Sequence, residues 1–164
     1  MRVELNAPVP EFRVPVTPAW QETLTEISPK DLLGHQWVLY FYPKDNTPTC
    51  TQEALDFKAE QAAFQAANTY ILGVSRDGLK AHTNFQAKHA LNFTLCSDKQ
   101  ETLCQLFDVL KMKKNFGREY LGIERSTFLI DRQGILRAEW RKVKLKDHVA
   151  QVLASAQNLH GATC

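Results

Sequence analysis

The chain has 164 residues, 44% of them hydrophobic, with seven glycines and seven prolines, which suffices for one packed core and predicts a single domain over residues 1–164. Its 20 basic and 18 acidic residues are mostly interspersed and give a formal net charge of +2, so neither nucleic acid nor a membrane is an expected partner. The opening residues lack a charged start followed by an apolar run, and no segment approaches the ~20 apolar residues of a membrane span. A cytoplasmic protein is therefore expected.

The first half of the chain predicts an arm, a strand and a helix. A proline-rich opening is typical of an extended arm that pairs at a sheet edge, and the continuous apolar run at 37–42 predicts a central strand. Apolar residues from Ala54 to Phe64 fall at helical spacing, so one helix is expected there. Thr47 and Pro48 supply its N-cap and its first residue.

The second half continues the alternation. Further strands are predicted at 70–74, 93–95, 126–130 and 135–140, and helices at 78–88, 99–107 and 146–158. Asp131 is interpreted as a turn residue, Asp147 as a helix-start residue, and the basic run from Lys111 to Arg118 as a solvated loop or helix end. The order predicts an α/β fold of thioredoxin-like type, with a central mixed β-sheet flanked by helices.

The four cysteines, at positions 50, 96, 104 and 164, form no CxxC motif and are too sparse for a small domain stabilised by disulfides. They are expected to be thiols at rest. Cys104 follows the apolar rhythm of its helix and is interpreted as a core residue. A thiol–disulfide oxidoreductase is not favoured, because it would need a second cysteine three residues from Cys50.

Cys50 lies in the first turn of the helix predicted to follow the central strand. Unpaired backbone N–H groups and the positive end of the helix dipole favour a thiolate there. Thr47 can offer a hydroxyl to the same spot, and Pro43 and Pro48 stiffen the loop, which predicts a small oxyanion-binding pocket. The same pattern also fits an ordinary helix start with Cys50 as a small apolar filler.

The motif Pro43-x-x-x-Thr47-x-x-Cys50 resembles the peroxidatic loop of the peroxiredoxins. The likeness extends through YFYPKDNTPTCTQEALDF (40–57), ILGVSRD (71–77), GIERSTFLID (122–131) and WRKVKLKDHV (140–149), which are similar to the bacterioferritin comigratory protein or peroxiredoxin Q subfamily. It covers nearly the whole chain. The resemblance implies a peroxiredoxin fold and a monomeric, thiol-dependent peroxidase that reduces hydrogen peroxide and organic hydroperoxides, with no metal or organic cofactor.

The resemblance also implies the roles of the site residues. Cys50 attacks the peroxide, and Arg125 completes the site, although an arginine before a strand also fits a surface ion pair. Thr47 and the Cys50 N–H hold the peroxide oxygens, and Pro43 walls the pocket. Glu53, one turn after Cys50, either orients Arg125 or is simply an acid favoured near a helix N-terminus.

Attack on a peroxide leaves Cys50 as a sulfenic acid, which a thiol must remove. The two positions that carry the resolving cysteine in this subfamily are Leu55 and Gln86 here, so a one-cysteine mechanism is expected. Its reductant would be thioredoxin, or glutaredoxin with glutathione. A two-cysteine cycle remains an alternative, with Cys96 at the sheet edge that Cys50 shares, or with Cys164 on a C-terminal tail.

Two further hypotheses concern other classes of protein. His82 and His89 lie seven residues apart in one predicted helix, but with Cys96 they match no known metal-ligand spacing, so surface histidines are expected. A non-catalytic thioredoxin-like binding or chaperone module, with an unreactive Cys50, is the alternative to an enzyme.

Overall fold

The computed structural model describes residues 2–18 and 24–162. Its helices are α1 (Pro29–Leu32), α2 (Pro48–Ala59), α3 (Gln61–Ala66), α4 (Leu79–Lys88), α5 (Thr102–Leu106) and α6 (His148–Ala162). Its strands are β1 (Val14–Pro15), β2 (Glu26–Ile27), β3 (Gln36–Phe41), β4 (Thr69–Ser75), β5 (Thr94–Ser97), β6 (Leu110–Asn115), β7 (Arg118–Ile123), β8 (Ser126–Ile130) and β9 (Leu136–Trp140). None of the helices in these ranges combines the length and the apolar character needed to cross a bilayer.

A five-stranded mixed sheet forms the centre, in the order β5-β4-β3-β8-β9. Strands β3, β4 and β5 are parallel, β8 runs antiparallel to its neighbour β3, and the edge strand β9 runs antiparallel to β8. The prediction of a central strand at 37–42 is confirmed, because β3 is the middle strand and all six of its residues are buried. A strand covered on both faces needs apolar side chains in both directions, which is why its sequence does not alternate.

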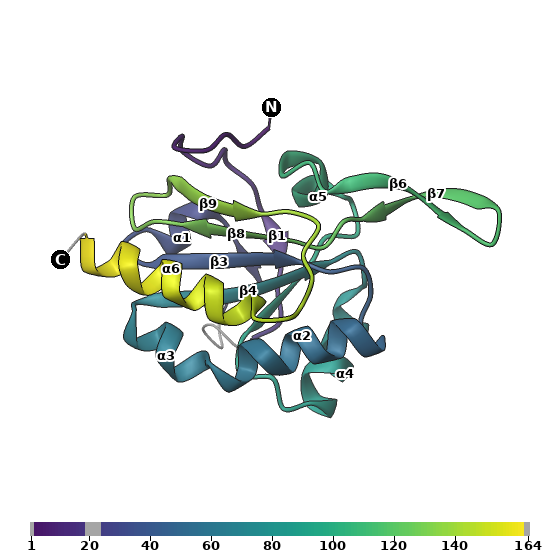
Figure 1. Ribbon diagram of the computed structural model, residues 1–164, viewed down its shortest axis with the longest axis horizontal. Helices are drawn as coiled ribbons and strands as arrows, with labels where there is room; N and C mark the ends of the chain where they lie inside the picture. The colour runs from purple at the N-terminus through teal and green to yellow at the C-terminus, as the bar shows by residue number, and fades with distance from the viewer. Residues whose placement is uncertain (1, 19–23, 163–164) are drawn as a thin grey trace.

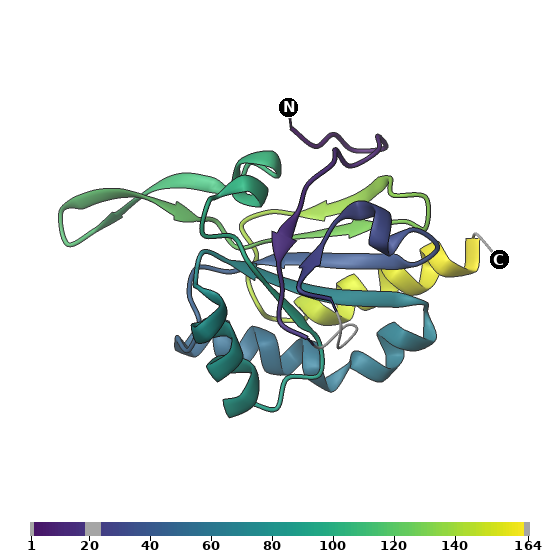
Figure 2. The same ribbon diagram turned by 180° about the vertical axis from the view of Figure 1, so that it is seen from behind.

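The sheet divides the core into two halves. Helices α2, α3, α4 and α6 cover one face, as Figure 1 shows, and contribute the apolar residues of one cluster. Helices α1 and α5 and the N-terminal arm cover the other face and belong to a second cluster (Figure 2). Neighbouring residues of β3 therefore face different halves of the core: Leu39 points into one and Tyr40 into the other.

The N-terminal arm pairs at the edges of this sheet, as predicted. Val16 forms an antiparallel bridge to Cys96 on the edge strand β5, and Pro8 bridges to Ile135 beside the opposite edge strand β9. The Thr17 N–H donates to Leu95 O (2.9 Å). The arm thus occupies backbone groups that an open edge would leave unpaired.

Two predicted helices differ in extent from the observed ones. The helix expected through Phe64 is interrupted at Glu60, after which α3 begins. The helix expected from residue 99 begins only at Thr102, because the Asp98 carboxylate accepts the N–H groups of Leu103 and Cys104 (3.0 and 2.8 Å). Asp98 satisfies the first-turn donors of α5 and ends the preceding loop.

The prediction of a loop or helix end for the basic run is wrong. Residues 110–123 form an antiparallel ribbon of β6 and β7, which projects from the body of the molecule (Figure 1). Phe116 and Gly117 form its tip, both with positive φ (51° and 78°), as a two-residue hairpin turn requires. Its three lysines give the run a polar appearance, and no alternation of apolar residues marks it as a strand.

Candidate active site

Cys50 is the third residue of α2, directly after the loop that leaves the central strand. Thr47 is the N-cap of this helix and Pro48 its first residue, as predicted. The first intrahelical hydrogen bond runs from the Thr51 N–H to Thr47 O (2.8 Å), so the Cys50 N–H belongs to the first turn, whose donors have no partner within the helix. The Cys50 side chain is only 2% exposed, which confines its sulfur beside these donors.

The Thr47 hydroxyl does not cap the helix. It donates to Lys44 O (2.9 Å), within the loop that carries it. Its hydrogen is therefore engaged, and its oxygen lone pairs can accept a hydrogen bond from a ligand. Thr47 and Pro43 are both half-buried, so both can line a pocket that remains open to a small molecule.

Arg125, between β7 and β8, links two groups on the first turns of α2. Its Nη2 donates to Cys50 Sγ (3.3 Å), and its Nη1 forms an ion pair with Glu53 Oε1 (2.5 Å). Glu53 is fully buried. The structure thus brings together Cys50, Glu53 and Arg125, although the arginine lies 75 residues after the cysteine in the chain.

Burial sets the electrostatics of this group. It raises the pKa of Glu53 to about 7, against the opposing effects of the Arg125 charge and hydrogen bond. Burial also disfavours the charged form of Arg125, but Glu53 and the Cys50 sulfur outweigh it and raise the pKa of the guanidinium. Arg125 is therefore a permanent cation at the sulfur, and a charge-assisted donor favours a thiolate.

A hydrogen-bond network that the sequence did not reveal supports the loop between β3 and α2. We call Tyr42, Asp45, Asp77 and His82 the His82 network. The prediction that His82 is a surface residue is wrong, because the side chain is fully buried. Its Nδ1 lies 2.7 Å from Asp45 Oδ2, and its Nε2 lies 2.9 Å from Cys96 O. Since a carbonyl only accepts, Nε2 is the donor to Cys96 O.

The rest of the network fixes the loop to β3 and β4. The Tyr42 hydroxyl donates to Asp45 Oδ1 (2.6 Å), and the Asp45 N–H donates to Asp77 Oδ2 (2.9 Å). Ligand atoms of Asp45, Asp77 and His82 lie within 4.8 Å of one another, the spacing of a metal site. Protein donors already occupy these carboxylates, so we interpret the group as a support for the loop rather than as a metal centre.

The other cysteines lie apart from Cys50. Cys96 is fully buried in the cluster on the far face of the sheet, so only its backbone lies on the edge that Cys50 shares. Cys104 is a core residue on that far face, as predicted. Burial raises the pKa of both thiols. Cys164 lies outside the described residues.

The two positions where a resolving cysteine was sought hold other side chains. Leu55 is half-buried on α2. Gln86 on α4 donates through Nε2 to Phe93 O (2.9 Å), which ties the helix to the start of β5. Neither residue offers a thiol to Cys50.

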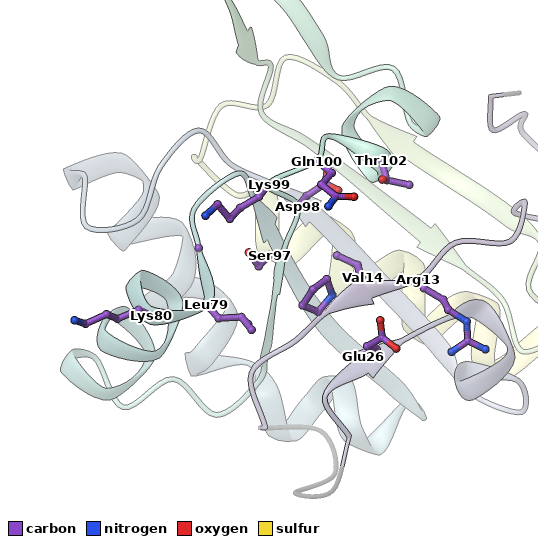
Figure 3. Close-up of a pocket in the computed structure, with 12 residues that line it drawn as sticks. Arg13, Val14, Glu26, Leu79, Lys80, Ser97, Asp98, Lys99, Gln100 and Thr102 are labelled. Atoms are coloured by element: carbon purple, nitrogen blue, oxygen red, sulfur yellow. The ribbon is translucent and has the colours of Figure 1, made fainter.

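The close-up in Figure 3 shows the lining of a cavity of about 500 Å³. The strand β1, the start of α4 and the segment 97–102 surround it, and its polar lining includes Arg13, Glu26, Lys80 and Lys99. Neither Cys50 nor Arg125 lines it. It is therefore not the pocket of the reactive sulfur.

Comparison with known proteins shows the family of the chain. The AhpC/TSA family matches residues 5–139. The chain is 53% identical over 129 residues to "Peroxiredoxin Bcp" of Bacillus subtilis, which covers 79% of this chain and 82% of the relative.

Two solved structures are similar to the whole fold. A "Peroxiredoxin Q" from Xanthomonas campestris superposes with a TM-score of 0.84 at 44% identity and covers 91% of each chain. A structure of the bacterioferritin comigratory protein from the same organism superposes with a TM-score of 0.83, also at 44% identity, over 91% of this chain and 92% of the other. Its title concerns alkyl peroxide reduction and a trapped intermediate.

Proposed function

The chain belongs to the AhpC/TSA family and, within it, to the Bcp or peroxiredoxin Q group of thiol peroxidases, and we propose that Cys50 is its peroxide-attacking residue. One observation carries the assignment: the sulfur lies in the first turn of α2 and also accepts a hydrogen bond from the Arg125 guanidinium (3.3 Å). Both features favour a nucleophilic thiolate. An apolar filler would need neither a helix end nor a cation.

In the proposed reaction, the Cys50 thiolate attacks one peroxide oxygen. The S–O bond forms as the O–O bond breaks, and the second oxygen leaves with the bonding pair and takes up a proton. Hydrogen peroxide then gives water, and an organic hydroperoxide gives an alcohol. The sulfur is oxidised to the sulfenic acid, and the peroxide is reduced by two electrons.

The neighbours of the sulfur divide the work of holding the two oxygens. Arg125 and the Cys50 N–H donate to the oxygens as negative charge develops on them. The Thr47 hydroxyl oxygen accepts a hydrogen bond from the peroxide O–H, because its own hydrogen is donated to Lys44 O. This refines the expectation that Thr47 donates. Glu53 holds Arg125 in position through their ion pair, and Pro43 closes one side of the pocket.

An external thiol, from thioredoxin or from glutaredoxin with glutathione, completes the proposed one-cysteine cycle. Leu55 and Gln86 stand at the familiar resolving positions, and the sheet separates the Cys96 thiol from Cys50. We further propose that the protein acts as a single-domain monomer in the cytoplasm, where reducing conditions keep such cysteines as thiols.

The test is the consumption of peroxide by the Cys50→Ser variant with dithiothreitol as reductant. Activity should vanish, because a serine hydroxyl is not ionised at neutral pH and cannot form a sulfenic acid. Cys104→Ser is the matched control and should retain activity if the variant folds. In parallel, the wild-type protein treated with one equivalent of hydrogen peroxide and a sulfenic-acid trap should carry one adduct, on Cys50. Full activity of Cys50→Ser would contradict the proposal and favour a non-catalytic role for this thiol.

A further inference from the structure

Lys113 on the projecting ribbon lies close to the catalytic arginine. It faces Tyr120 across the ribbon, and its stem crosses Gly122, where an added Cβ would come within 2.8 Å of Lys113 Cδ. Its ammonium donates to Ile123 O (2.5 Å), two residues before Arg125. The absence of a side chain at Gly122 thus lets this lysine lie along β7 and place its charge beside the end of the strand.

This ammonium has no counter-ion in the described part of the chain. Lys113 is half-buried, and none of the ion pairs there includes it. Burial lowers its pKa, and the Arg125 charge lowers it further, whereas Cys50 and Glu124 raise it. The charge of Lys113 therefore acts within range of both the arginine and the sulfur. A partly desolvated cation without a counter-ion is costly and suits a binding site for an anion.

A basic cleft of about 720 Å³ adjoins Lys113, between the base of the ribbon and the segment 141–142. Its charged lining comprises Lys111, Lys113, Arg141, Lys142, Asp108 and Glu124. Asp108 is already paired with Arg2 and Lys111 (2.9 and 3.3 Å). The Val143 N–H donates to Arg125 O (3.0 Å), so the 141–143 wall of the cleft is tied to the backbone of the catalytic arginine.

We propose that Lys113 and this cleft bind the carboxylate of a small anionic thiol, of the glutathione class, that reduces the Cys50 sulfenic acid. The inference rests on the proposed function and names the class of its reductant. Hydrogen peroxide carries no charge for the cleft to hold, whereas the cycle needs an external thiol. A carboxylate anchored at Lys113 would raise the local concentration of that thiol beside Cys50.

The reductive half of the cycle balances with two such thiols. The first thiolate attacks the sulfenic sulfur, an S–S bond forms, the S–O bond breaks, and the hydroxide leaves as water after taking up a proton. The second thiolate attacks the bound thiol's sulfur of this mixed disulfide and releases Cys50 as a thiolate. Two thiols are oxidised to one disulfide, and the sulfenic acid is reduced by two electrons.

The experiment measures this half-reaction alone. Reduced protein is oxidised with one equivalent of hydrogen peroxide and mixed with 3-mercaptopropionate, 2-mercaptoethanol or cysteamine, which are similar in size but anionic, neutral and cationic. Rapid quenching and intact mass follow the loss of the sulfenic acid. For each thiol the rate of a variant is divided by the wild-type rate, which cancels the intrinsic reactivity of the thiol.

Lys113→Met should lower the rate of sulfenic acid reduction by 3-mercaptopropionate about tenfold, keep the rate with 2-mercaptoethanol within about twofold, and raise the rate with cysteamine. These changes are expected for one charge contact in a partly screened pocket. Lys113→Arg should keep the wild-type order of rates. Lys114→Met is the matched control, because it removes the same charge from the opposite face of the ribbon and should change all three rates little.

Three results would overturn the inference. Equal slowing by Lys113→Met and Lys114→Met would show a general effect of net charge. The cleft would instead belong to the oxidising substrate if Lys113→Met slowed only the oxidation of Cys50, and only by a carboxylate-bearing hydroperoxide. Oxidation by tert-butyl hydroperoxide is the uncharged comparison. Failure of the wild-type protein to form a sulfenic acid would overturn the proposed function as well, and is distinguishable because it precedes addition of the thiol.

Discussion

Arg125 is the residue on which the proposed chemistry depends most directly. It places a permanent positive charge 3.3 Å from the sulfur while Glu53 holds its other terminal nitrogen. The ion pair is almost fully removed from water, so the loss of either partner would leave a buried charge uncompensated. Effects on rate and effects on stability must therefore be separated in any variant.

We predict that Arg125→Met lowers the rate constant for Cys50 oxidation by about a hundredfold or more, since a preorganised donor to the developing charge is lost. The variant should also lose stability because Glu53 is left without its cation. The double variant Arg125→Met/Glu53→Gln should recover that stability but not the rate. Single-turnover oxidation and urea unfolding measure the two effects. A double variant with a wild-type rate would remove Arg125 from the mechanism.

Individual residues were predictable from the sequence to the extent that their chemistry is local. The positions of Thr47, Pro48 and Cys50 at a helix start follow from capping preferences. Arg125 required the family resemblance, because a contact across 75 residues leaves no trace in local spacing. Lys113 was not predicted, since its position depends on a ribbon that the sequence analysis did not recognise.

At the scale of elements, the His82 network joins the loop before α2 to three further parts of the fold. Asp45 belongs to the loop, Tyr42 directly follows the central strand β3, and His82 lies on α4 with its Nε2 on the carbonyl of Cys96 in β5. The helix that carries Cys50 begins only a few residues later. A buried histidine on a neighbouring helix thus fixes the loop from which the site is built.

We predict that His82→Phe lowers the free energy of unfolding by about 2–4 kcal/mol, because the Asp45 carboxylate and the Cys96 carbonyl lose buried hydrogen bonds. The rate of Cys50 oxidation should also fall as the loop loses its support. His89→Phe is the matched control on α4, since His89 lies outside the network and should leave that rate unchanged. Urea unfolding and single-turnover oxidation test both statements. Equal effects of the two substitutions would contradict the assignment.

The order of elements was largely predictable, whereas the β6–β7 ribbon and the burial of His82 were not. Continuous or alternating apolar runs indicated β3, β4, β8 and β9, and helical spacing indicated α2, α4 and α6. The β6–β7 ribbon was missed because few of its residues are buried, so it lacks the apolar period that identifies a strand. His82 was wrongly predicted to lie on the surface, because its hydrogen-bond partners come from separate elements that only the fold brings together.

At the scale of the whole molecule, two buried groups give opposite dependences of stability on pH. Burial and the nearby Arg125 charge lower the pKa of His148 to about 4. Between pH about 4 and 6.5 the unfolded chain binds a proton that the folded protein does not, so this residue makes stability rise with pH. Burial raises the pKa of Glu53 to about 7, so stability falls as pH rises from about 4.5 to 7.

We predict that these two slopes largely cancel between about pH 4.5 and 6.5, and that single substitutions reveal them. Relative to wild type, Glu53→Gln should gain up to about 3 kcal/mol of unfolding free energy as pH rises through this range, and His148→Gln should lose a similar amount. Urea unfolding at half-unit intervals from pH 4 to 7.5 provides the measurement. Parallel curves for both variants and the wild-type protein would contradict the prediction.

The placement of the cysteines on different faces of the sheet has a consequence for how the molecule can be observed. Cys96 in β5 and Cys104 in α5 are fully buried in the core cluster on the face of the sheet away from Cys50, so an alkylating reagent reaches them only when this core opens. Each modified core thiol then records one opening of the fold. The protein thus carries two internal chemical reporters of its own unfolding, which an alkylating reagent can read in a cell extract without an engineered probe site.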